Sequence, residues 1–367
     1  MSPARLYNAI GLMSGTSLDG VDAALIATDG QFSITCGPAL TISYGEDMRA
    51  KLRAVLGCRP GERAAEVADA AAEITRLHAE AVAELRAQCG SPAIDVIGFH
   101  GHTIFHRPQE GITVQIGDGA LLAKLTGVDV IDNFRSQDVA QGGEGAPFVP
   151  LFHAAMAANQ PHPVAVLNLG GVGNVTWIDG DMAPIAFDTG PGNALLDDWV
   201  RRHTGEAYDK EGQLAASGRT DRAALAHLLT HPFFARKPPK SLDRNEFAEF
   251  ALDAVAGLSL ADGAATLAAF TAHAVARAFG HLPAAPCRLL VTGGGRRNRA
   301  LISALTDLLP CPVMAVEAVG WDGDALEAQA FGYLAVRSLL GLPLSLPSTT
   351  GVRQPVSGGK LHRAQAA

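Results

Sequence analysis

Residues 14–22 bring glycines, hydroxyl groups and carboxylates together in one short stretch, and this combination suits a phosphate site. The apolar runs on either side, residues 6–13 and 21–27, indicate two strands joined by a tight turn. Successive backbone N–H groups of a glycine-rich turn can converge on an anion. The turn has neither the lysine of a Walker A loop nor a G-x-G-x-x-G spacing, so a hairpin would bind the phosphate here, not the start of a helix.

The side chains of this turn add both donors and charge. Three hydroxyl groups can donate to phosphate oxygens, those of Ser14, Thr16 and Ser17. Asp19 or Asp22 can hold a divalent cation that neutralises phosphate charge, and we expect Asp19 to be that ligand. Gly, Ser and Asp are equally common in ordinary turns, so this stretch alone does not separate a phosphate site from a plain hairpin.

A second stretch repeats the arrangement, because residues 164–178 are typical of a strand, a glycine-rich turn and a strand. Its tip contains Gly171, Gly173 and Asn174. A third glycine turn follows an apolar strand and precedes a helix, and it consists of Gly293, Gly294 and Gly295. Asn298, just beyond it, can hydrogen-bond a ribose or a base. A bulged strand pair and a flexible loop are the alternatives, but two matching hairpins, one in each half, favour an internal duplication that grips a polyphosphate.

Three carboxylates stand where they can act on a ligand. Asp188 ends an apolar run and precedes a Thr-Gly-Pro-Gly-Asn turn, a position that suits a general base. Asp118 has a similar setting, and both residues suit helix capping equally well. Glu327 enters an apolar helix, where the helix dipole favours an acid, but it can also orient a sugar hydroxyl.

Arg135 and a group of histidines complete the candidate residues. Arg135 follows a strand and precedes a glycine-rich loop, so it is either a bidentate clamp for a carboxylate or a surface arginine. The nearest histidines are His100, His102, His106 and His153. No carboxylate motif accompanies them, so we interpret them as structural or substrate-facing and not as metal ligands.

The elements that must position these residues alternate between strands and helices. Residues 64–86 carry apolar side chains at helical spacing without Gly or Pro, which predicts a long helix. Apolar runs at 94–99, 128–131 and 288–292 predict short strands. We interpret the polar stretch 204–245 as an insertion beside the active site, and the segment beyond residue 343 as a peripheral tail.

The composition limits the class of protein. A length of 367 residues favours two domains, and 48% apolar with 18% charged residues indicates packed globular structure. A net charge of −8 argues against nucleic-acid and anionic-membrane partners and favours small-molecule ligands. Five scattered cysteines without C-x-x-C spacing, and the lack of an apolar run of membrane length, lead us to expect a reducing cytoplasm.

Taken in order, the two glycine hairpins and the third glycine turn resemble the phosphate and adenosine motifs of the actin, hexokinase and heat-shock-chaperone ATPase superfamily. Residues 11–22 resemble more closely the signature of the anhydro-N-acetylmuramic acid kinase family. Further motifs of that family are matched by residues 101–106, 115–118, 138–147, 168–174, 188–193 and 293–295. The resemblance therefore covers nearly the whole chain.

The resemblance implies an α/β, two-domain actin-like ATPase fold, with duplicated ribonuclease-H-like cores flanking a nucleotide cleft. We expect one domain at residues 1–150, joined by a tail from about 340 to 367, and a second at 151–339. The family uses ATP and water to open the 1,6-anhydro bond of anhydro-N-acetylmuramate in cell-wall recycling, giving N-acetylmuramate 6-phosphate and ADP. A homodimer and a requirement for Mg²⁺ are also expected.

The resemblance assigns roles residue by residue. Asp188 matches the catalytic base, and Glu327 matches an acid of the active-site region. The expected ATP-binding residues are Gly15, Thr16, Ser17, Leu18, Asp19, Gly20, Val21, Asp22, Gly171, Gly173, Asn174, Gly293, Gly294, Gly295 and Asn298. The expected substrate-binding residues are Ser14, His102, Gln115, Asp118, Arg135 and Asn193. Residues 240–246 depart from the Lys-Ser-Thr-Gly-Arg-Glu type of stretch found in many members.

Two alternatives remain open at this stage. One is a kinase that acts on another sugar or acid, and the other is a non-catalytic, actin-like nucleotide-binding protein. Asp188 and its turn favour the enzyme, because a binding module needs no general base.

Overall fold

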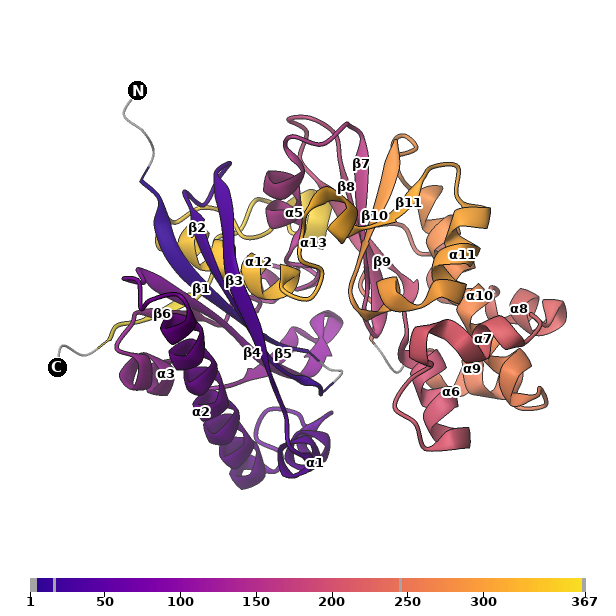
Figure 1. Ribbon diagram of the computed structural model, residues 1–367, viewed down its shortest axis with the longest axis horizontal. Coiled ribbons are helices and arrows are strands. Elements are labelled where there is room, and N and C mark those ends of the chain that lie inside the picture. The colour runs from indigo at the N-terminus through magenta and orange to yellow at the C-terminus, as the bar shows by residue number, and fades with distance from the viewer. Residues whose placement is uncertain (1–4, 16–17, 244–245, 365–367) are drawn as a thin grey trace. The chain divides into compact units, whose positions relative to one another are not determined.

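The computed structural model describes residues 5–15, 18–243 and 246–364 (Figure 1). The chain divides into two compact units, which we describe separately. Unit 1 comprises Met1–Ala158 and Ala325–Ala367, and unit 2 comprises Asn159–Asp324. These bounds differ from the expected division at residues 150 and 339, because the helices Pro150–Ala157 and Leu326–Leu339 belong to unit 1.

Unit 1 contains a sheet of seven strands in its described part. The strands are β1 (Tyr7–Ser14), β2 (Gly20–Thr28), β3 (Ile34–Ser43), β4 (Val96–Arg107), β5 (Ile112–Ile116), β6 (Val130–Asp132) and β12 (Lys360–His362). Their order is β12-β6-β4-β1-β2-β3, with β5 paired to β4. β1 runs antiparallel to β2 and parallel to β4, so the first glycine hairpin opens at the end of a central strand.

Unit 2 repeats this order in a sheet of five described strands. They are β7 (Val164–Leu169), β8 (Val172–Ile178), β9 (Ile185–Pro191), β10 (Arg288–Thr292) and β11 (Val313–Ala315), arranged as β11-β10-β7-β8-β9. β7 is antiparallel to β8 and parallel to β10, as β1 is to β2 and β4. The repeated order and strand directions confirm the predicted α/β fold with duplicated cores.

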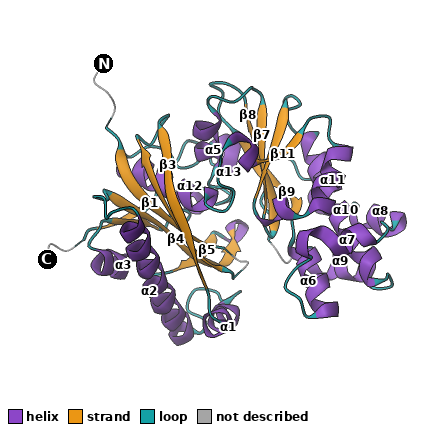
Figure 2. Cartoon of the chain, in the orientation of Figure 1, coloured by secondary structure: helices purple, strands orange, loops and turns teal. Residues whose placement is uncertain are grey.

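Helices flank both sheets (Figure 2). Those of unit 1 are α1 (Glu46–Val55), α2 (Ala64–Gln88), α3 (Gly119–Thr126), α4 (Ser136–Ala140), α5 (Pro150–Ala157), α12 (Leu326–Leu339) and α13 (Pro347–Thr350). Those of unit 2 are α6 (Ala194–Thr204), α7 (Gln213–Ser217), α8 (Arg222–Leu228), α9 (Ala248–Val255), α10 (Leu260–Phe279) and α11 (Arg299–Leu308). The long helix predicted at 64–86 is confirmed as α2.

Alternation along β1 explains how unit 1 packs. Ile10 and Leu12 belong to the apolar core that contains Ile74 and Val82 of α2, whereas Gly11 faces α12. A Cβ atom on Gly11 would lie 1.7 Å from the carbonyl oxygen of Ala328. Because successive side chains of a strand point to opposite faces, α2 and α12 cover opposite faces of the sheet. Helix α12 is therefore part of the core of unit 1.

Several predicted boundaries were wrong. The strand predicted at 94–99 continues to Arg107, because β5 pairs with its second half. The polar stretch 204–245 contains α7 and α8. Beyond it α9 and α10 are separate helices, and α10 begins where the Ser259 side chain accepts a hydrogen bond from the Asp262 N–H.

The tail is less peripheral than expected. Ser345 and Thr350 are buried and donate hydrogen bonds of 2.5 Å to the buried Asp138 carboxylate, and β12 joins the sheet beside β6. The tail is thus fastened into unit 1.

Candidate active site

The tip of the first hairpin is held by side chains of unit 1. The N–H of Leu18 donates to the Gly15 carbonyl at 3.1 Å, and Leu18 takes a left-handed φ of 61°. Arg49 Nε donates to the Leu18 carbonyl at 3.1 Å. Asp19 is exposed at this tip, so its carboxylate is accessible to a cation in solution. The expected roles of Thr16 and Ser17 lie outside the described residues.

Behind the tip the chain is buried and paired. Gly20 and Val21 begin β2, and a Cβ atom on Gly20 would lie 2.3 Å from the Ile42 carbonyl oxygen. The half-buried Asp22 accepts a hydrogen bond of 2.6 Å from Thr41 Oγ1. These residues support the hairpin from within the sheet.

Ser14 lies at the entrance of the hairpin in a buried hydrogen-bonded group. Its Oγ is 2.6 Å from the Tyr44 hydroxyl and 2.9 Å from Nδ1 of His102. Burial lowers the pKa of His102 to about 4, so its ring is neutral at physiological pH. The structure thus joins two of the expected substrate-binding residues, Ser14 and His102, and adds Tyr44, which no motif had indicated.

Arg135 is engaged within unit 1. Its Nε donates to Nε2 of His100 at 3.0 Å, and its Nη1 donates to the Gly145 carbonyl at 2.7 Å. Burial and the nearby guanidinium hold the pKa of His100 well below its usual value, so its Nε2 can accept this bond. Arg135 is therefore not the isolated surface arginine that we weighed as an alternative.

Gln115 and Asp118 have local structural contacts. Gln115 Nε2 donates to the hydroxyls of Thr103 and Thr113 at 3.2 and 2.8 Å. The exposed Asp118 is the N-cap of α3, where its Oδ1 accepts a bond of 2.9 Å from the Leu121 N–H. The capping interpretation of Asp118 is thus realised.

Asp188 lies on β9 of unit 2, buried beside the segment that departs from the family pattern. Its Oδ2 accepts a hydrogen bond of 2.7 Å from the Leu242 N–H, and its own N–H donates to the Lys240 carbonyl at 3.0 Å. The carboxylate is therefore fixed in orientation by residues more than fifty positions away. Sequence reasoning missed this partnership, because nothing in residues 240–242 specifies which strand they join.

Lys240 brings a buried amine near this carboxylate. Its Nζ donates to the Phe233 carbonyl at 3.3 Å and lies 4.2 Å from the centre of the Phe233 ring. Burial and the charge of Arg236 lower the pKa of Lys240 to about 8, while the negative charge of Asp188 opposes that shift. Asp188 therefore has a cationic neighbour at neutral pH.

The second hairpin and the third glycine turn meet within unit 2. The carbonyls of Gly171 and Gly170 accept hydrogen bonds of 2.9 and 2.8 Å from the N–H groups of Gly192 and Asn193. Asn193 Nδ2 donates to the Leu169 carbonyl at 2.8 Å. Cβ atoms on Gly293 and Gly295 would meet Asn168 Oδ1 at 2.3 Å and Leu169 Cβ at 2.5 Å. The expected phosphate and adenosine motifs of this half are therefore adjacent.

Other expected ligands of unit 2 lie around this junction. Gly173 packs on Thr189, whose Oγ1 a Cβ atom would approach to 2.7 Å. Asn174 is paired with Asp188 across β8 and β9, and its Oδ1 is buried with no hydrogen-bond partner among the described residues. Asn298 caps α11 by accepting from the Leu301 N–H at 3.0 Å, so one of its polar atoms has a structural role.

The second expected catalytic residue, Glu327, lies in the first turn of α12 and is half-buried. It belongs to unit 1, whereas Asp188 belongs to unit 2. The two expected catalytic carboxylates are thus supplied by different halves of the duplicated fold.

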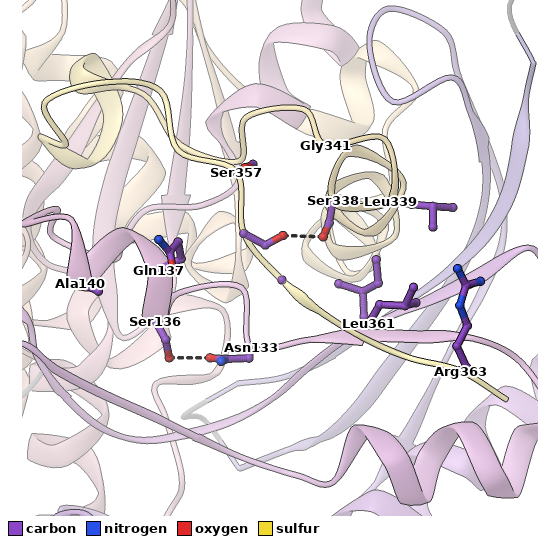
Figure 3. Close-up of a pocket in the computed structure, with 13 residues that line it drawn as sticks. Asn133, Ser136, Gln137, Ala140, Ser338, Leu339, Gly341, Ser357, Leu361 and Arg363 are labelled. Carbon is purple, nitrogen blue, oxygen red and sulfur yellow. Dashed lines mark hydrogen bonds between the residues drawn. The ribbon is translucent and has the colours of Figure 1, made fainter. Parts of the chain in front are cut away.

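A cavity of about 650 Å³ lies elsewhere in unit 1 (Figure 3). Among the described residues, none of the expected site residues lines it. Its walls come from β6, α4, the end of α12 and the tail, and include Asn133, Ser136, Ser338, Gly358 and Arg363. Ser136 donates to Asn133 Oδ1 and Ser338 donates to the Gly358 carbonyl, so these hydroxyl protons are used within the wall. This cavity is distinct from the residues to which we assign the chemistry.

Two kinds of feature are absent from the described part of the chain. It contains no group of three or more His, Cys, Asp or Glu side chains arranged to hold a metal ion by themselves. Nor does any helix within residues 5–15, 18–243 and 246–364 have the length and apolar character needed to cross a membrane.

The chain was compared with known proteins. The family model described as anhydro-N-acetylmuramic acid kinase matches residues 7–364. A protein of that name from Rhodospirillum rubrum is 59% identical over 96% of this chain and 93% of its own length. Another, from Paramagnetospirillum magneticum, is 54% identical over 96% of this chain and 99% of its own length.

Among solved structures, the activator of the 2-hydroxyisocaproyl-CoA dehydratase from Clostridium difficile, with bound ADPNP, is 11% identical and has a TM-score of 0.48. That comparison covers 90% of this chain and 94% of the other. A likeness at this level does not by itself indicate a shared activity. The match of the family model to almost the whole chain, together with relatives above 50% identity over full length, establishes that the chain belongs to the anhydro-N-acetylmuramic acid kinase family.

Proposed function

We propose that this protein uses ATP and water to convert anhydro-N-acetylmuramic acid into N-acetylmuramate 6-phosphate and ADP. Membership of the kinase family supports the reaction class. The observation that carries the proposal is the buried Asp188 carboxylate, which the Leu242 N–H orients next to the second glycine hairpin. A binding module would have no need for such a carboxylate, so the non-catalytic alternative is not favoured.

In this proposal Asp188 acts as the general base. It takes a proton from a water molecule as that water attacks the anomeric carbon of the sugar. The bond from the anomeric carbon to the bridging oxygen breaks, and the freed oxygen at position 6 accepts the γ-phosphoryl group of ATP while ADP leaves. The 2.7 Å bond from Leu242 fixes the carboxylate, and such positioning supplies much of the rate in reactions of this kind.

We assign ATP to the two hairpins and the third glycine turn. Phosphoryl transfer depends on positioning and charge stabilisation, which backbone N–H groups at glycine turns supply. The proposed ligands are residues 15–22 of unit 1, with Gly171, Gly173, Asn174, Gly293, Gly294, Gly295 and Asn298 of unit 2. Asn298 would use the polar atoms that the cap of α11 leaves over.

Mg²⁺ fits these residues without a preformed cage. Mg²⁺ in kinases is usually held by one or two carboxylates together with phosphate oxygens, so the lack of a three-residue cluster among the described residues is compatible with it. Asp19, exposed at the tip of the first hairpin, is the carboxylate we assign to it. The ion would neutralise charge on the β- and γ-phosphates.

The sugar side is proposed to use Ser14, His102, Gln115, Asp118, Arg135 and Asn193, with Glu327 orienting a hydroxyl. Asp118 is the weakest member of this set, because its carboxylate caps α3 and is exposed. A role in peptidoglycan recycling, a cytoplasmic location and a homodimeric state complete the proposal.

The test compares Asp188→Asn with the wild-type protein in an ADP-release assay with anhydro-N-acetylmuramate. We expect turnover to fall by at least about 10³-fold while ADP affinity changes less than about threefold, because the amide keeps the position but loses the basicity. Asp181→Asn, at an exposed carboxylate of the same unit, is the matched control and should remain fully active. Near-normal turnover of Asp188→Asn would overturn the base assignment.

A second arm tests the substrate. Ordinary N-acetylmuramate, other anhydro sugars and simple hexoses replace anhydro-N-acetylmuramate in the same assay. Activity that requires the anhydro ring supports the proposal, whereas activity confined to sugars with an intact hemiacetal would favour a kinase of another sugar.

A further inference from the structure

Tyr44 contacts both limbs of the first glycine hairpin. It follows directly after β3, and its N–H donates to the Asp19 carbonyl at 2.9 Å, on the limb that leaves the turn. Its hydroxyl lies 2.6 Å from Ser14 Oγ, on the limb that enters the turn. One residue, distant in sequence from any glycine motif, therefore spans the ends of the loop.

The hydroxyl contact is buried on every side. Tyr44 is 3% exposed, Ser14 is 1% exposed and His102 is fully buried, so water cannot replace a lost bond without rearrangement. Nδ1 of His102 is a second hydrogen-bond partner of Ser14 Oγ, at 2.9 Å. Buried polar groups that lose a partner bear the full cost of desolvation, so this contact should have a measurable effect.

The group is uncharged at physiological pH. Burial, assisted by the nearby Asp22 carboxylate, raises the pKa of the Tyr44 hydroxyl. Burial also lowers the pKa of His102 to about 4. The contact between Tyr44 and Ser14 is therefore a neutral hydrogen bond throughout the range in which an enzyme of this family would be assayed.

We propose that Tyr44 is a positioning residue, which fixes the geometry of the first hairpin for the triphosphate of ATP by holding Ser14 and Asp19 at once. This inference rests on the proposed assignment of ATP to that hairpin. Tyr44 does not touch the reacting atoms. It acts through the loop, and so it controls nucleotide affinity more than it controls the chemical step.

The test is Tyr44→Phe, which keeps the ring and the backbone bond to Asp19 but removes the hydroxyl. One neutral hydrogen bond corresponds to a change of about two- to tenfold in an equilibrium constant. We expect the KM for ATP and the dissociation constant for ADP to rise by that factor, while kcat at saturating substrates changes less than about twofold. Ser14→Ala should give a similar effect on ADP binding.

The double variant, Tyr44→Phe with Ser14→Ala, distinguishes a role in nucleotide binding from a purely structural role. Both single variants break the same bond, so their effects on ADP affinity should be clearly less than additive in the double variant. Tyr333→Phe is the matched control. The Tyr333 hydroxyl is also buried in unit 1, but it donates to the Gln31 carbonyl at 2.9 Å, away from the glycine turn. The Tyr333→Phe variant should have lower thermal stability but unchanged ADP affinity.

Direct ADP binding by calorimetry keeps this test independent of the reaction. If the wild-type protein binds ADP but does not turn over the anhydro sugar, the proposed substrate fails while the inference on Tyr44 is still decided by affinity. If Tyr44→Phe weakens ADP binding no more than Tyr333→Phe does, or if the Tyr44 and Ser14 effects add fully, the proposed role of Tyr44 is wrong.

Discussion

His78 should make unit 1 sensitive to mild acid, and replacing it should remove part of that sensitivity. Its ring is fully buried on α2, with Nδ1 2.7 Å from the Ile74 carbonyl and the edge of the ring against Phe99. Nε2 is buried without a hydrogen-bond partner among the described residues. Burial lowers the pKa of His78 to about 4 from an ordinary value of 6.5. The ring is therefore neutral in the folded protein, and protonation favours the unfolded chain.

The sign and the size of this change in stability with pH follow from proton linkage. Between these two pKa values the unfolded chain binds a proton that the folded chain does not, so the free energy of unfolding falls as pH falls. With a pKa of 6.5 unfolded and about 4 folded, the loss from His78 is about 0.2 kcal/mol at pH 7 and about 2 kcal/mol at pH 5. The wild-type unit 1 should therefore lose nearly 2 kcal/mol from this group alone between those pH values.

The variant His78→Leu removes the titrating group and the unpaired Nε2. We expect its stability at pH 7 to lie within about 1 kcal/mol of the wild type, because the Ile74 carbonyl keeps its bond within the helix. Between pH 7 and pH 5 it should lose about 2 kcal/mol less than the wild type. Urea unfolding at pH 7, 6 and 5, followed by far-ultraviolet circular dichroism, measures this difference.

The distribution of tryptophan provides an internal check. All three tryptophans, Trp177, Trp199 and Trp321, lie in unit 2, so their fluorescence reports on that unit and should respond much less to His78→Leu. His227→Gln, at an exposed histidine of unit 2, is the matched control. Equal losses in wild-type and His78→Leu protein between pH 7 and pH 5 would refute the reasoning from burial.

Two further changes test the packing of unit 1. Gly11→Ala would place a methyl group 1.7 Å from the Ala328 carbonyl oxygen, so α12 must shift, and we expect a loss of about 3 kcal/mol or failure to fold in thermal unfolding. Gly257→Ala is the control, because a Cβ atom there meets nothing within 4 Å, and its stability should stay within about 0.5 kcal/mol of wild type. An equal loss of stability in the two variants would contradict the close contact at Gly11. Asp138→Ala leaves Ser345, Thr350 and the Gly145 N–H without their acceptor. Hydrogen exchange in the tail should therefore accelerate by about 10²-fold. Unchanged exchange would show that the Asp138 carboxylate does not hold the tail in place.

The sequence was a good guide to features that depend on local pattern. The 3.6-residue spacing of apolar side chains predicted α2, and apolar runs on either side of glycine turns predicted both hairpins. Their similarity also predicted the duplicated cores, because each half contains the same order of signals. These features follow from periodicity and turn chemistry, which neighbouring residues determine by themselves.

Features that depend on distant partners could not be predicted in the same way. Helix α12 looks the same from its sequence whichever unit it joins, and only the close contacts at Gly11 and Gly98 show that it covers the sheet of unit 1. Asp188 accepts a hydrogen bond from the backbone N–H of Leu242, and the residue types in the sequence do not indicate which backbone group becomes a partner. Asp118 carried two interpretations and Asn298 was expected only as a nucleotide ligand, and the helix caps formed by both appear only when the helices are in place.

The two hairpins share a topology but are stabilised by different groups. The first is held by side chains, since Tyr44 and His102 contact Ser14 and Arg49 contacts Leu18. The second is held by its own backbone, because the Gly170 and Gly171 carbonyls accept from the turn that follows β9. A closely packed backbone junction needs residues without side chains, which explains the glycines at Gly173, Gly293 and Gly295. Substitution of the surrounding side chains should therefore alter the first hairpin, whereas at the second a Cβ atom on Gly173, Gly293 or Gly295 would lie within 2.7 Å of a neighbouring atom.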